Sequence, residues 1–335
     1  MTLFDPFIKN KLGDVEFTVS PLAGDASSRR YYRVMSGQKS WVLMEWEPFQ
    51  EISDFPFLSV QQYFASNGVR VPKIYDYDKS TGLFLLEDLG DLTLERRFWE
   101  FQSQEVVIPY YKKTLDQLIQ IHSLSFNESS LRNCTAYTNE FSVEKLVWEM
   151  NYAKKYLIKE LLQYPLSDTE ESQLEHDFLT VCTQLYQSPQ VICHRDFHSR
   201  NVMLHFNDVV VIDFQDARLG PPVYDLVSLF CDSYVDLNPQ TIAQLMDYYI
   251  LNFPHFKDLE LSREQFQSFY DLQTLQRCFK ACGSFASFKV MREDTRYLGY
   301  IAPTLARVLK QLEQSQLSPS LQNILAQTQE SWKAL

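Results

Sequence analysis

The spacing of apolar residues changes once along this chain, near Gly90. Before that point, short segments with strand-like composition alternate with turns such as Ser36-Gly37-Gln38-Lys39. The predicted strands are Phe17–Leu22, Arg29–Met35, Ser40–Glu45, Lys73–Asp78 and Leu83–Glu87. One segment, Phe55–Asn67, has helical spacing and stops at Gly68. The first part of the chain is therefore predicted to form a small sheet with one helix.

After Gly90 the apolar residues recur with a period near 3.6 over long stretches, which predicts helices. The longest are Glu105–Leu124, Ser142–Gln163 and Asp168–Gln187, and the third begins with a capping box of Ser167 and Glu170. Two short apolar runs, Val191–Cys193 and Val209–Ile212, interrupt the helices, which resume at Tyr224. A chain of 335 residues suits two lobes. We expect an α+β protein with a strand-rich lobe at residues 1–90 and a helical lobe at residues 91–335.

The overall charge limits the class of partner. The net charge of −12 argues against nucleic acid as a partner, because phosphate backbones require clustered Lys and Arg.

The six cysteines contain no Cys-x-x-Cys pair, which favours reduced, buried thiols. Met1–Leu12 lacks the apolar core of a signal peptide, and no apolar run approaches the ~20 residues that span a bilayer. We expect a cytoplasmic protein that binds neither nucleic acid nor membranes. The oligomeric state stays open.

The most informative stretch lies between the two short apolar runs. It reads His194-Arg195-Asp196-Phe197-His198-Ser199-Arg200-Asn201, and the second run then ends in Asp213. Phosphoryl transfer requires a carboxylate that accepts the acceptor hydroxyl's proton, and an Asn with a second carboxylate that hold magnesium. A single Asp after an apolar strand usually caps a turn. The pattern here has four residues in fixed order next to predicted strands, His194, Asp196, Asn201 and Asp213, and such a pattern is specific for phosphoryl transfer.

This stretch resembles the catalytic and metal-binding loops of the aminoglycoside phosphotransferase and choline kinase superfamily. The resemblance implies a protein-kinase-like fold with ATP and Mg²⁺ as cofactors. It also implies that Asp196 is the catalytic base, that Asn201 and Asp213 bind Mg²⁺, and that His194 and His198 support the loop. A zinc site at the two histidines lacks further ligands at suitable spacing. Gly220-Pro221-Pro222-Val223-Tyr224-Asp225 follows as in this superfamily, and we expect Asp225 to brace the catalytic loop.

The nucleotide-binding residues are indicated by position and by the same resemblance. The loop Leu22–Ser28 lies where kinases place a Gly-rich flap over the phosphates, although it contains a single Gly. Ser27 and Ser28 are the candidate contacts there. The segment Leu85–Gly90 matches the hinge whose backbone reads adenine, with Glu87 and Leu89 as the candidates.

One position departs from the superfamily pattern. Met44 stands on the third strand where a phosphate-binding Lys is expected, and the following helix has no Glu to pair with such a Lys. Strand alternation places Arg30, Tyr32 and Val34 on one face. If Val34 faces the nucleotide, as its superfamily counterpart does, Arg30 replaces the lysine through its bidentate fork. The alternative is a solvated, charged strand face.

Further segments narrow the acceptor. The chain is similar to the bacterial anomeric kinases that phosphorylate N-acetylmuramate and N-acetylglucosamine during cell-wall recycling. This similarity rests on the loop from Gly24 to Arg33, on Met44 in place of Lys, on the motif from His194 to Asn201 and on Gln276–Phe285. The similarity implies a sugar 1-phosphate as product. An aminoglycoside phosphotransferase and a pseudokinase-type binding module remain as alternatives.

The residues that bind the acceptor stay open. Trp148, Tyr152 and Tyr156 recur every four residues, and either stack on a sugar or belong to the core. Arg277 and Lys280 either meet a lactyl carboxylate or pair on the surface.

Overall fold

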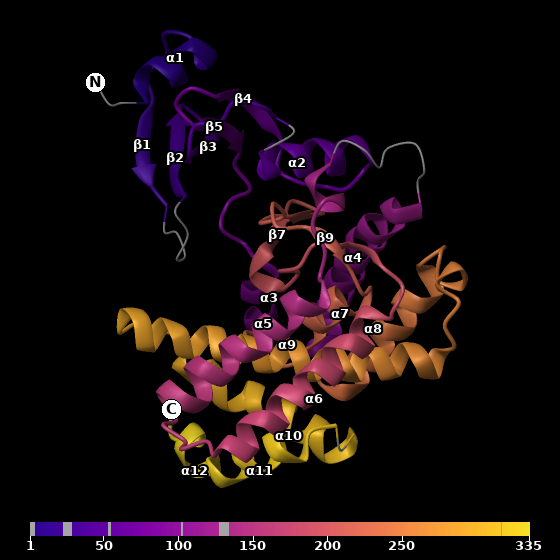
Figure 1. Ribbon diagram of the computed structural model, residues 1–335. Coiled ribbons are helices and arrows are strands. Elements are labelled where there is room, and N and C mark those ends of the chain that lie inside the picture. Colours follow the sequence, from indigo (N-terminus) through magenta and orange to yellow (C-terminus); the bar gives the residue numbers. More distant parts are fainter. Residues whose placement is uncertain (1–3, 23–28, 53–54, 102, 127–133, 316) are drawn as a thin grey trace.

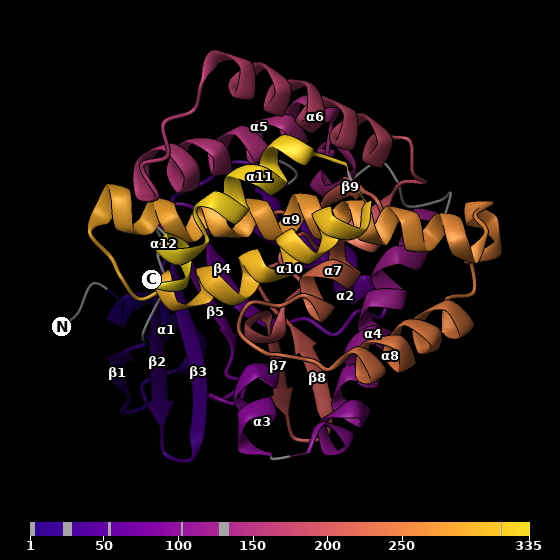
Figure 2. The same ribbon diagram turned by 90° about the horizontal axis from the view of Figure 1, so that it is seen from below.

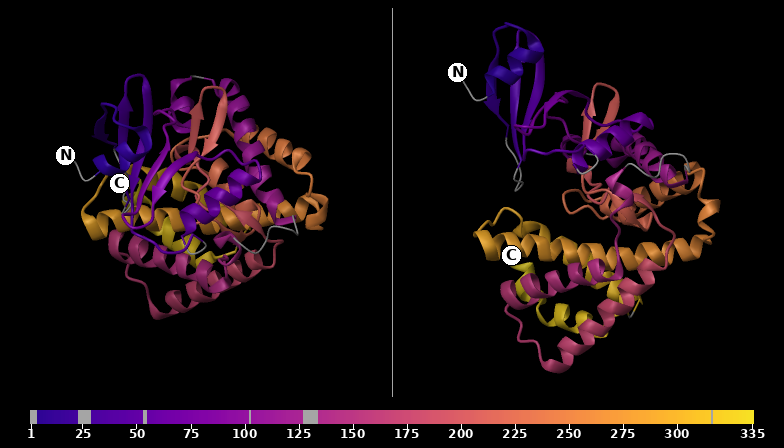
Figure 3. Two further views of the ribbon diagram at one scale, coloured as in Figure 1. Left: turned by 90° about the horizontal axis from the view of Figure 1, so that it is seen from above. Right: turned by 45° about the horizontal axis from the view of Figure 1, so that its top comes forward.

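The computed structural model describes residues 4–22, 29–52, 55–101, 103–126, 134–315 and 317–335. A β-sheet with α1 (Asp5–Leu12) and α2 (Pro56–Ser66) forms one end of the molecule, and α10 to α12 lie at the other end (Figures 1 and 3). The α+β fold with an antiparallel sheet and a mainly helical remainder is the predicted one. The last strand of the sheet ends at Glu87 and the next helix begins at Leu94. The division at residue 90 stays a prediction.

The N-terminal sheet is antiparallel throughout, with the strand order β1-β2-β3-β5-β4. Its strands are β1 (Thr18–Pro21), β2 (Arg30–Ser36), β3 (Lys39–Glu45), β4 (Ile74–Asp78) and β5 (Leu83–Glu87). The turn before β5 depends on Gly82, which has a φ of +71°, and an added Cβ would lie 2.1 Å from the Trp46 carbonyl oxygen. Only glycine fits both the conformation and the space.

The two faces of this sheet are covered by different elements. On one face Val34 and Leu43 pack with Ile8 of α1. On the other face Met44 belongs to the main core together with Phe57 of α2. The apolar content of α1 is low, and the sequence did not predict this helix. Its position decides which side of β2 faces the rest of the protein.

The helical part is organised around α9 (Arg263–Arg292), which packs against α5, α7 and α10. Figure 2 shows α9 crossing the lobe between the other helices. Those helices are α3 (Leu94–Glu100), α4 (Gln104–Ser123), α5 (Val143–Ala153), α6 (Asp168–Tyr186), α7 (Val223–Phe230), α8 (Pro239–Asn252), α10 (Ile301–Ser315), α11 (Pro319–Gln327) and α12 (Gln329–Lys333). At the crossing with α5, a Cβ on Gly283 would lie 2.3 Å from the Ala153 Cα. Glycine therefore sets the close approach of these two helices.

The predicted long helices are present, with one difference. The segment expected as a single helix from Ser142 to Gln163 is α5 followed by a π-helix over Lys154–Leu161. Such wide turns occur often at functional sites. The capping box of Ser167 and Glu170 is confirmed at the start of α6.

Two small sheets carry the motif region. The predicted strands appear as β6 (Val191–Cys193) and β8 (Asp208–Val211). Their partners, β9 (Arg218–Gly220) and β7 (Val202–His205), were not predicted. All six cysteines are buried and unpaired, as expected. Among the described residues, no helix has both the length and the apolarity that a membrane span requires.

Candidate active site

The loop after β6 is fixed by the buried carboxylate of Asp225. Its Oδ2 accepts a hydrogen bond from the His194 backbone N–H at 2.6 Å, and its Oδ1 accepts one from the Arg195 N–H at 2.9 Å. Arg195 has a φ of +82°, a conformation that a non-glycine residue keeps only when its surroundings impose it. Asp225 lies in the first turn of α7 and therefore braces the loop, as the sequence predicted.

Further contacts hold the loop from its other sides. The His194 Nε2 lies 3.0 Å from the Ile212 carbonyl oxygen, which ties the loop to the end of β8. The Asp232 Oδ2 accepts from the Ser199 N–H at 2.8 Å. Arg200 binds Glu95 of α3 through two nitrogens, at 2.9 and 3.0 Å. The loop is therefore a rigid support for the side chain of Asp196.

The three residues predicted for catalysis and metal binding come together. The Asn201 Nδ2 donates to the Asp196 carbonyl oxygen at 2.9 Å and lies 3.5 Å from the Asp213 Oδ2. Burial lowers the pKa of His198, so its neutral ring can accept from the same Nδ2, 3.3 Å away. Asp213 has a φ of +65°. Of the six non-glycine residues with positive φ in the described part of the chain, two, Arg195 and Asp213, thus occur at the motif.

The environment of Asp196 keeps its carboxylate ionised. Burial alone would raise the pKa of Asp196, but the positive charges of Lys280 and Arg195 outweigh it and hold that pKa well below its ordinary value. An ionised carboxylate can accept a proton at neutral pH.

Asn201 and Asp213 offer donors that suit a hard divalent cation. Because Asn201 donates through Nδ2, its Oδ1 remains an acceptor, and Asp213 supplies carboxylate oxygens beside it. Within the described residues, the one cluster of His, Cys, Asp and Glu close enough to hold a metal is His122, Cys193 and Asp225. That cluster is buried, and Asp225 already serves the loop. The oxygen pair at the motif fits magnesium better.

A pocket of about 460 Å³ lies between the N-terminal sheet and the motif. Glu87 and Leu89 line it, together with Asn201 and Asp213. Its wall is largely apolar, with Val42, Leu86, Met203, Ile212 and Phe214 contributed by both parts of the molecule. A planar aromatic base fits such a slot, with its phosphates directed towards the polar end.

The acidic residues of this pocket are paired with arginines. Arg33 binds Asp88 and Asp91, each at 2.8 Å. Arg70 binds Glu87 at 2.6 Å. The two predicted phosphate contacts Ser27 and Ser28 lie outside the described residues.

The predicted facing of β2 is wrong. Arg30, Tyr32 and Val34 do share a face, but α1 covers that face, and the Arg30 side chain is 74% exposed beside Glu45. Arg29, Tyr31 and Arg33 line the pocket instead. The Arg29 guanidinium donates to the Asp213 Oδ1 at 2.8 Å and to the Gln215 Oε1 at 2.9 Å.

Met44 lies on the pocket side of the sheet, opposite Tyr31, but it is fully buried and does not line the pocket. The Phe57 ring of α2 packs on Phe214, with centroids 5.3 Å apart. The sequence lacks the Lys on β3 and the Glu on α2 that would form an ion pair here. In the structure, apolar side chains such as Met44 and Phe57 fill this position.

A second pocket, of about 320 Å³, lies between α5 and α9. Trp148, Tyr152, Arg195 and Lys280 line it. The helical stripe of aromatics is thus divided: Trp148 is 55% exposed at the pocket, whereas Tyr156 packs against the core. Glu149 also lines this pocket and was missed from the sequence, although a Glu on the apolar face of a helix is an available signal.

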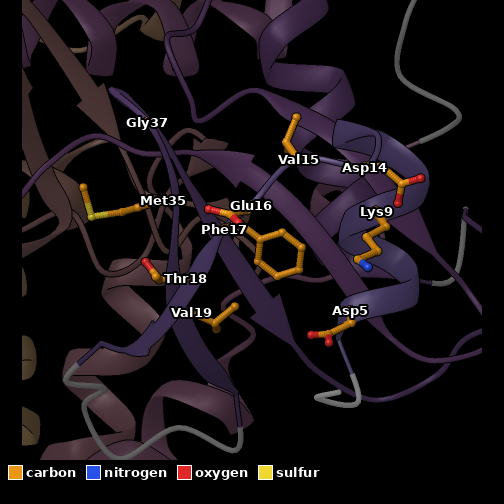
Figure 4. Close-up of a pocket in the computed structure, with 10 residues that line it drawn as sticks. All are labelled: Asp5, Lys9, Asp14, Val15, Glu16, Phe17, Thr18, Val19, Met35 and Gly37. Atoms are coloured by element: carbon orange, nitrogen blue, oxygen red, sulfur yellow. The ribbon is translucent and has the colours of Figure 1, made fainter.

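A third hollow, of about 910 Å³, lies on the N-terminal part between α1 and β1 (Figure 4). Its wall includes Asp5, Lys9, Phe17 and Met35. None of the motif residues lies there, and the hollow is not a candidate active site despite its size.

Comparison with known proteins identifies the family. A model described as the phosphotransferase enzyme family matches residues 18–260. An N-acetylmuramate/N-acetylglucosamine kinase of Pseudomonas aeruginosa is 31% identical over 320 residues, covering 90% of this chain and 88% of that protein. A protein of the same name from Neisseria meningitidis serogroup B is 27% identical over 300 residues, covering 85% of each chain.

The fold has solved counterparts as well. The structure of an ADP-bound aminoglycoside phosphotransferase is similar with a TM-score of 0.59 and 16% identity, covering 92% of this chain and 97% of that chain. The fold is therefore protein-kinase-like. With a family model that covers most of its length and a relative that matches nearly all of it, the chain belongs to the phosphotransferase enzyme family and is an ATP-dependent small-molecule kinase.

Proposed function

We propose that this kinase transfers the γ-phosphoryl group of ATP to the anomeric hydroxyl of an N-acetyl amino sugar, N-acetylmuramate or N-acetylglucosamine, in the cytoplasm. The product is the sugar 1-phosphate, and the reaction serves the recycling of cell-wall sugars. The names of the relatives support the acceptor class. The choice of the anomeric oxygen rests on the sequence similarity described above.

The observation that carries this proposal is the charge of the pocket between α5 and α9. Three basic side chains, Arg195, Lys280 and Arg292, line it against one acidic side chain, Glu149. Such a wall repels a polycation and favours a neutral or anionic acceptor. It therefore speaks for a neutral or acidic sugar and against an aminoglycoside.

We assign Asp196 as the base that accepts the proton of the acceptor hydroxyl. Its carboxylate is ionised, and an anomeric hydroxyl is more acidic than an ordinary alcohol, so positioning suffices for proton transfer. Asn201 and Asp213 are assigned to Mg²⁺, which neutralises phosphate charge when bound. The rigid loop holds all three groups in place without help from the substrate.

On the nucleotide side we assign the phosphate contact to Arg29 rather than to Arg30. Arg29 lines the pocket and reaches Asp213, and its position beside the Trp46 ring, 5.0 Å away, limits its freedom. The backbone of the hinge at Glu87 and Leu89 is assigned to adenine. Ser27 and Ser28 stay predicted phosphate contacts.

The site of phosphorylation can be tested through the reducing end of the sugar. A 1-phosphate has no free reducing end, whereas a phosphate on any other hydroxyl leaves it intact. The purified protein with Mg·ATP should abolish the reducing-sugar signal of N-acetylglucosamine in step with ADP release. ADP release with a retained reducing end would refute phosphorylation of the anomeric hydroxyl, although the protein would still be a sugar kinase.

A further inference from the structure

The pocket between α5 and α9 contains a buried carboxylate oxygen with no partner. Glu149 is 1% exposed and lines the pocket. Its Oε2 accepts a hydrogen bond from the Gln276 Nε2 at 3.0 Å, whereas its Oε1 has no hydrogen-bond partner. Gln276 is itself held by Gln273, whose Nε2 donates to the Gln276 Oε1 at 2.8 Å. This relay fixes the orientation of the Glu149 carboxylate.

An unsatisfied carboxylate oxygen in a buried position is costly unless a ligand supplies a donor. Sugar hydroxyls are such donors. The Trp148 ring, exposed at the same pocket and 5.3 Å from the Tyr152 ring, offers an apolar surface for the C–H face of a pyranose. The pocket therefore combines a hydroxyl acceptor with an aromatic wall.

Two cationic side chains that line this pocket, Lys280 and Arg292, also lack an ion-pair partner within the described residues. Of the described residues, none forms an ion pair within 4.0 Å with Lys280 or with Arg292. The Arg195 Nη1 lies 3.0 Å from the Asp216 Oδ2, but the buried Arg195 Nε has no hydrogen-bond partner. Lys145 adds a further cation above the Trp148 ring, 4.0 Å from its centroid. Among the residues that line this pocket, Glu149 is the one acidic side chain, and the Asp196 carboxylate is the other negative charge that Lys280 faces.

We propose that this pocket is the acceptor subsite and that it selects a sugar bearing a carboxylate. Glu149 accepts a hydrogen bond from a ring hydroxyl of the sugar, and Lys280 pairs with the carboxylate of its substituent, with Arg292 at the rim. N-acetylmuramate carries a lactyl carboxylate, which N-acetylglucosamine lacks. This inference rests on the proposed function, since it takes these two sugars as the acceptors.

The test compares kcat/KM for the two sugars at saturating Mg·ATP. The wild-type protein should prefer N-acetylmuramate by about ten- to a hundredfold, the range that charge-assisted hydrogen bonds supply. Lys280→Met should reduce this ratio to near one, whatever its absolute rate. Lys289→Met, on the same helix but paired with Glu293, is the matched control and should keep the ratio. An unchanged ratio in Lys280→Met would overturn the assignment of Lys280.

A second measurement uses the unmodified protein. The methyl ester of N-acetylmuramate keeps the shape of the substituent without its charge, and its kcat/KM should fall to that of N-acetylglucosamine. An ester as good as the free acid would overturn the selection of a carboxylate.

Glu149→Gln should raise the KM of both sugars about tenfold while the affinity for ATP is kept, because a ring hydroxyl is common to both. An unchanged KM for both would overturn the role of Glu149. Turnover of neither sugar by the wild-type protein would instead refute the proposed function. Turnover of both at similar kcat/KM would refute only the selection of a carboxylate.

Discussion

The two pockets to which the motif contributes residues differ in how their charges are balanced. In the nucleotide pocket each acidic side chain pairs with an arginine of the protein: Glu87 with Arg70, Asp88 and Asp91 with Arg33, and Asp213 with Arg29. In the pocket between α5 and α9, Lys280 and the Glu149 Oε1 have no such partner among the described residues. Internal pairing fixes a pocket before its ligand binds, whereas unpaired groups gain their partner from the ligand. The second pocket is therefore where we expect substrate selection.

Asp196 belongs to the motif that contributes Arg195 to one pocket and Asn201 to the other, and its replacement should have the largest effect. Asp196→Asn removes the group that accepts the proton, and kcat should fall by about 10²–10⁴-fold. Binding of ATP should stay within about twofold of wild type, because the nucleotide pocket keeps its charges. Both are measured by ADP release and by nucleotide titration. A kcat within a few-fold of wild type would show that another group is the base.

Asp213→Ala addresses the nucleotide pocket alone. Removal of a carboxylate ligand should weaken magnesium-dependent nucleotide binding by about a hundredfold, since even residues behind metal ligands contribute 10–100-fold. Titration of ATP with and without Mg²⁺ measures the effect. Identical metal dependence in variant and wild type would place the metal elsewhere.

Arg29, just before β2, and Arg30, its first residue, provide a matched pair: Arg29 lines the nucleotide pocket, whereas Arg30 is exposed beside Glu45. Arg29→Ala should raise the KM for ATP or lower kcat by about ten- to a hundredfold, the range of charge-assisted hydrogen bonds. Arg30→Ala should change both by less than about twofold, because exposed ion pairs contribute little. Steady-state kinetics at varied ATP decide between them. A large effect of Arg30→Ala together with a small effect of Arg29→Ala would support the prediction from the sequence that Arg30 faces the nucleotide.

The smallest effect concerns the stability of the hinge. Burial alone would raise the pKa of Glu87, but hydrogen bonds from Arg70 and from the Lys73 N–H lower it overall. A lowered folded-state pKa stabilises the fold above the unfolded value of about 4.3, and this contribution disappears as pH falls through the folded-state pKa. Glu87→Gln should therefore cost about 1 kcal/mol of unfolding free energy near pH 7 and less towards pH 3.

Denaturant unfolding at several pH values measures this difference. Glu47→Gln, at an exposed position in the same lobe, is the control and should change the free energy of unfolding little. An equal loss for Glu87→Gln at pH 7 and pH 3 would mean that its charge is not involved.

The sequence predicted what is encoded locally. The residues from His194 to Asn201 are contiguous, and Asp213 ends the next predicted strand, so their meeting follows from two strands and a loop. The prediction that Arg30 faces the nucleotide was wrong because the facing of β2 depends on α1. This helix has a low apolar content, and Ile8 is its one buried residue. The place of Glu149 on the apolar face of α5 is a local signal for burial, but its hydrogen bond with Gln276 is not, because Gln276 lies 127 residues further along the chain. Long-range pairing of polar side chains leaves no local pattern.

The most direct test of the proposed function compares anionic and neutral sugars with cationic acceptors. ADP release by the purified protein should be measured with N-acetylmuramate, N-acetylglucosamine, an aminoglycoside and choline, with Asp196→Asn as the blank. We predict release with the two sugars and a signal at the level of the blank with the two cations. Release with the aminoglycoside or choline and none with either sugar would contradict the proposed function.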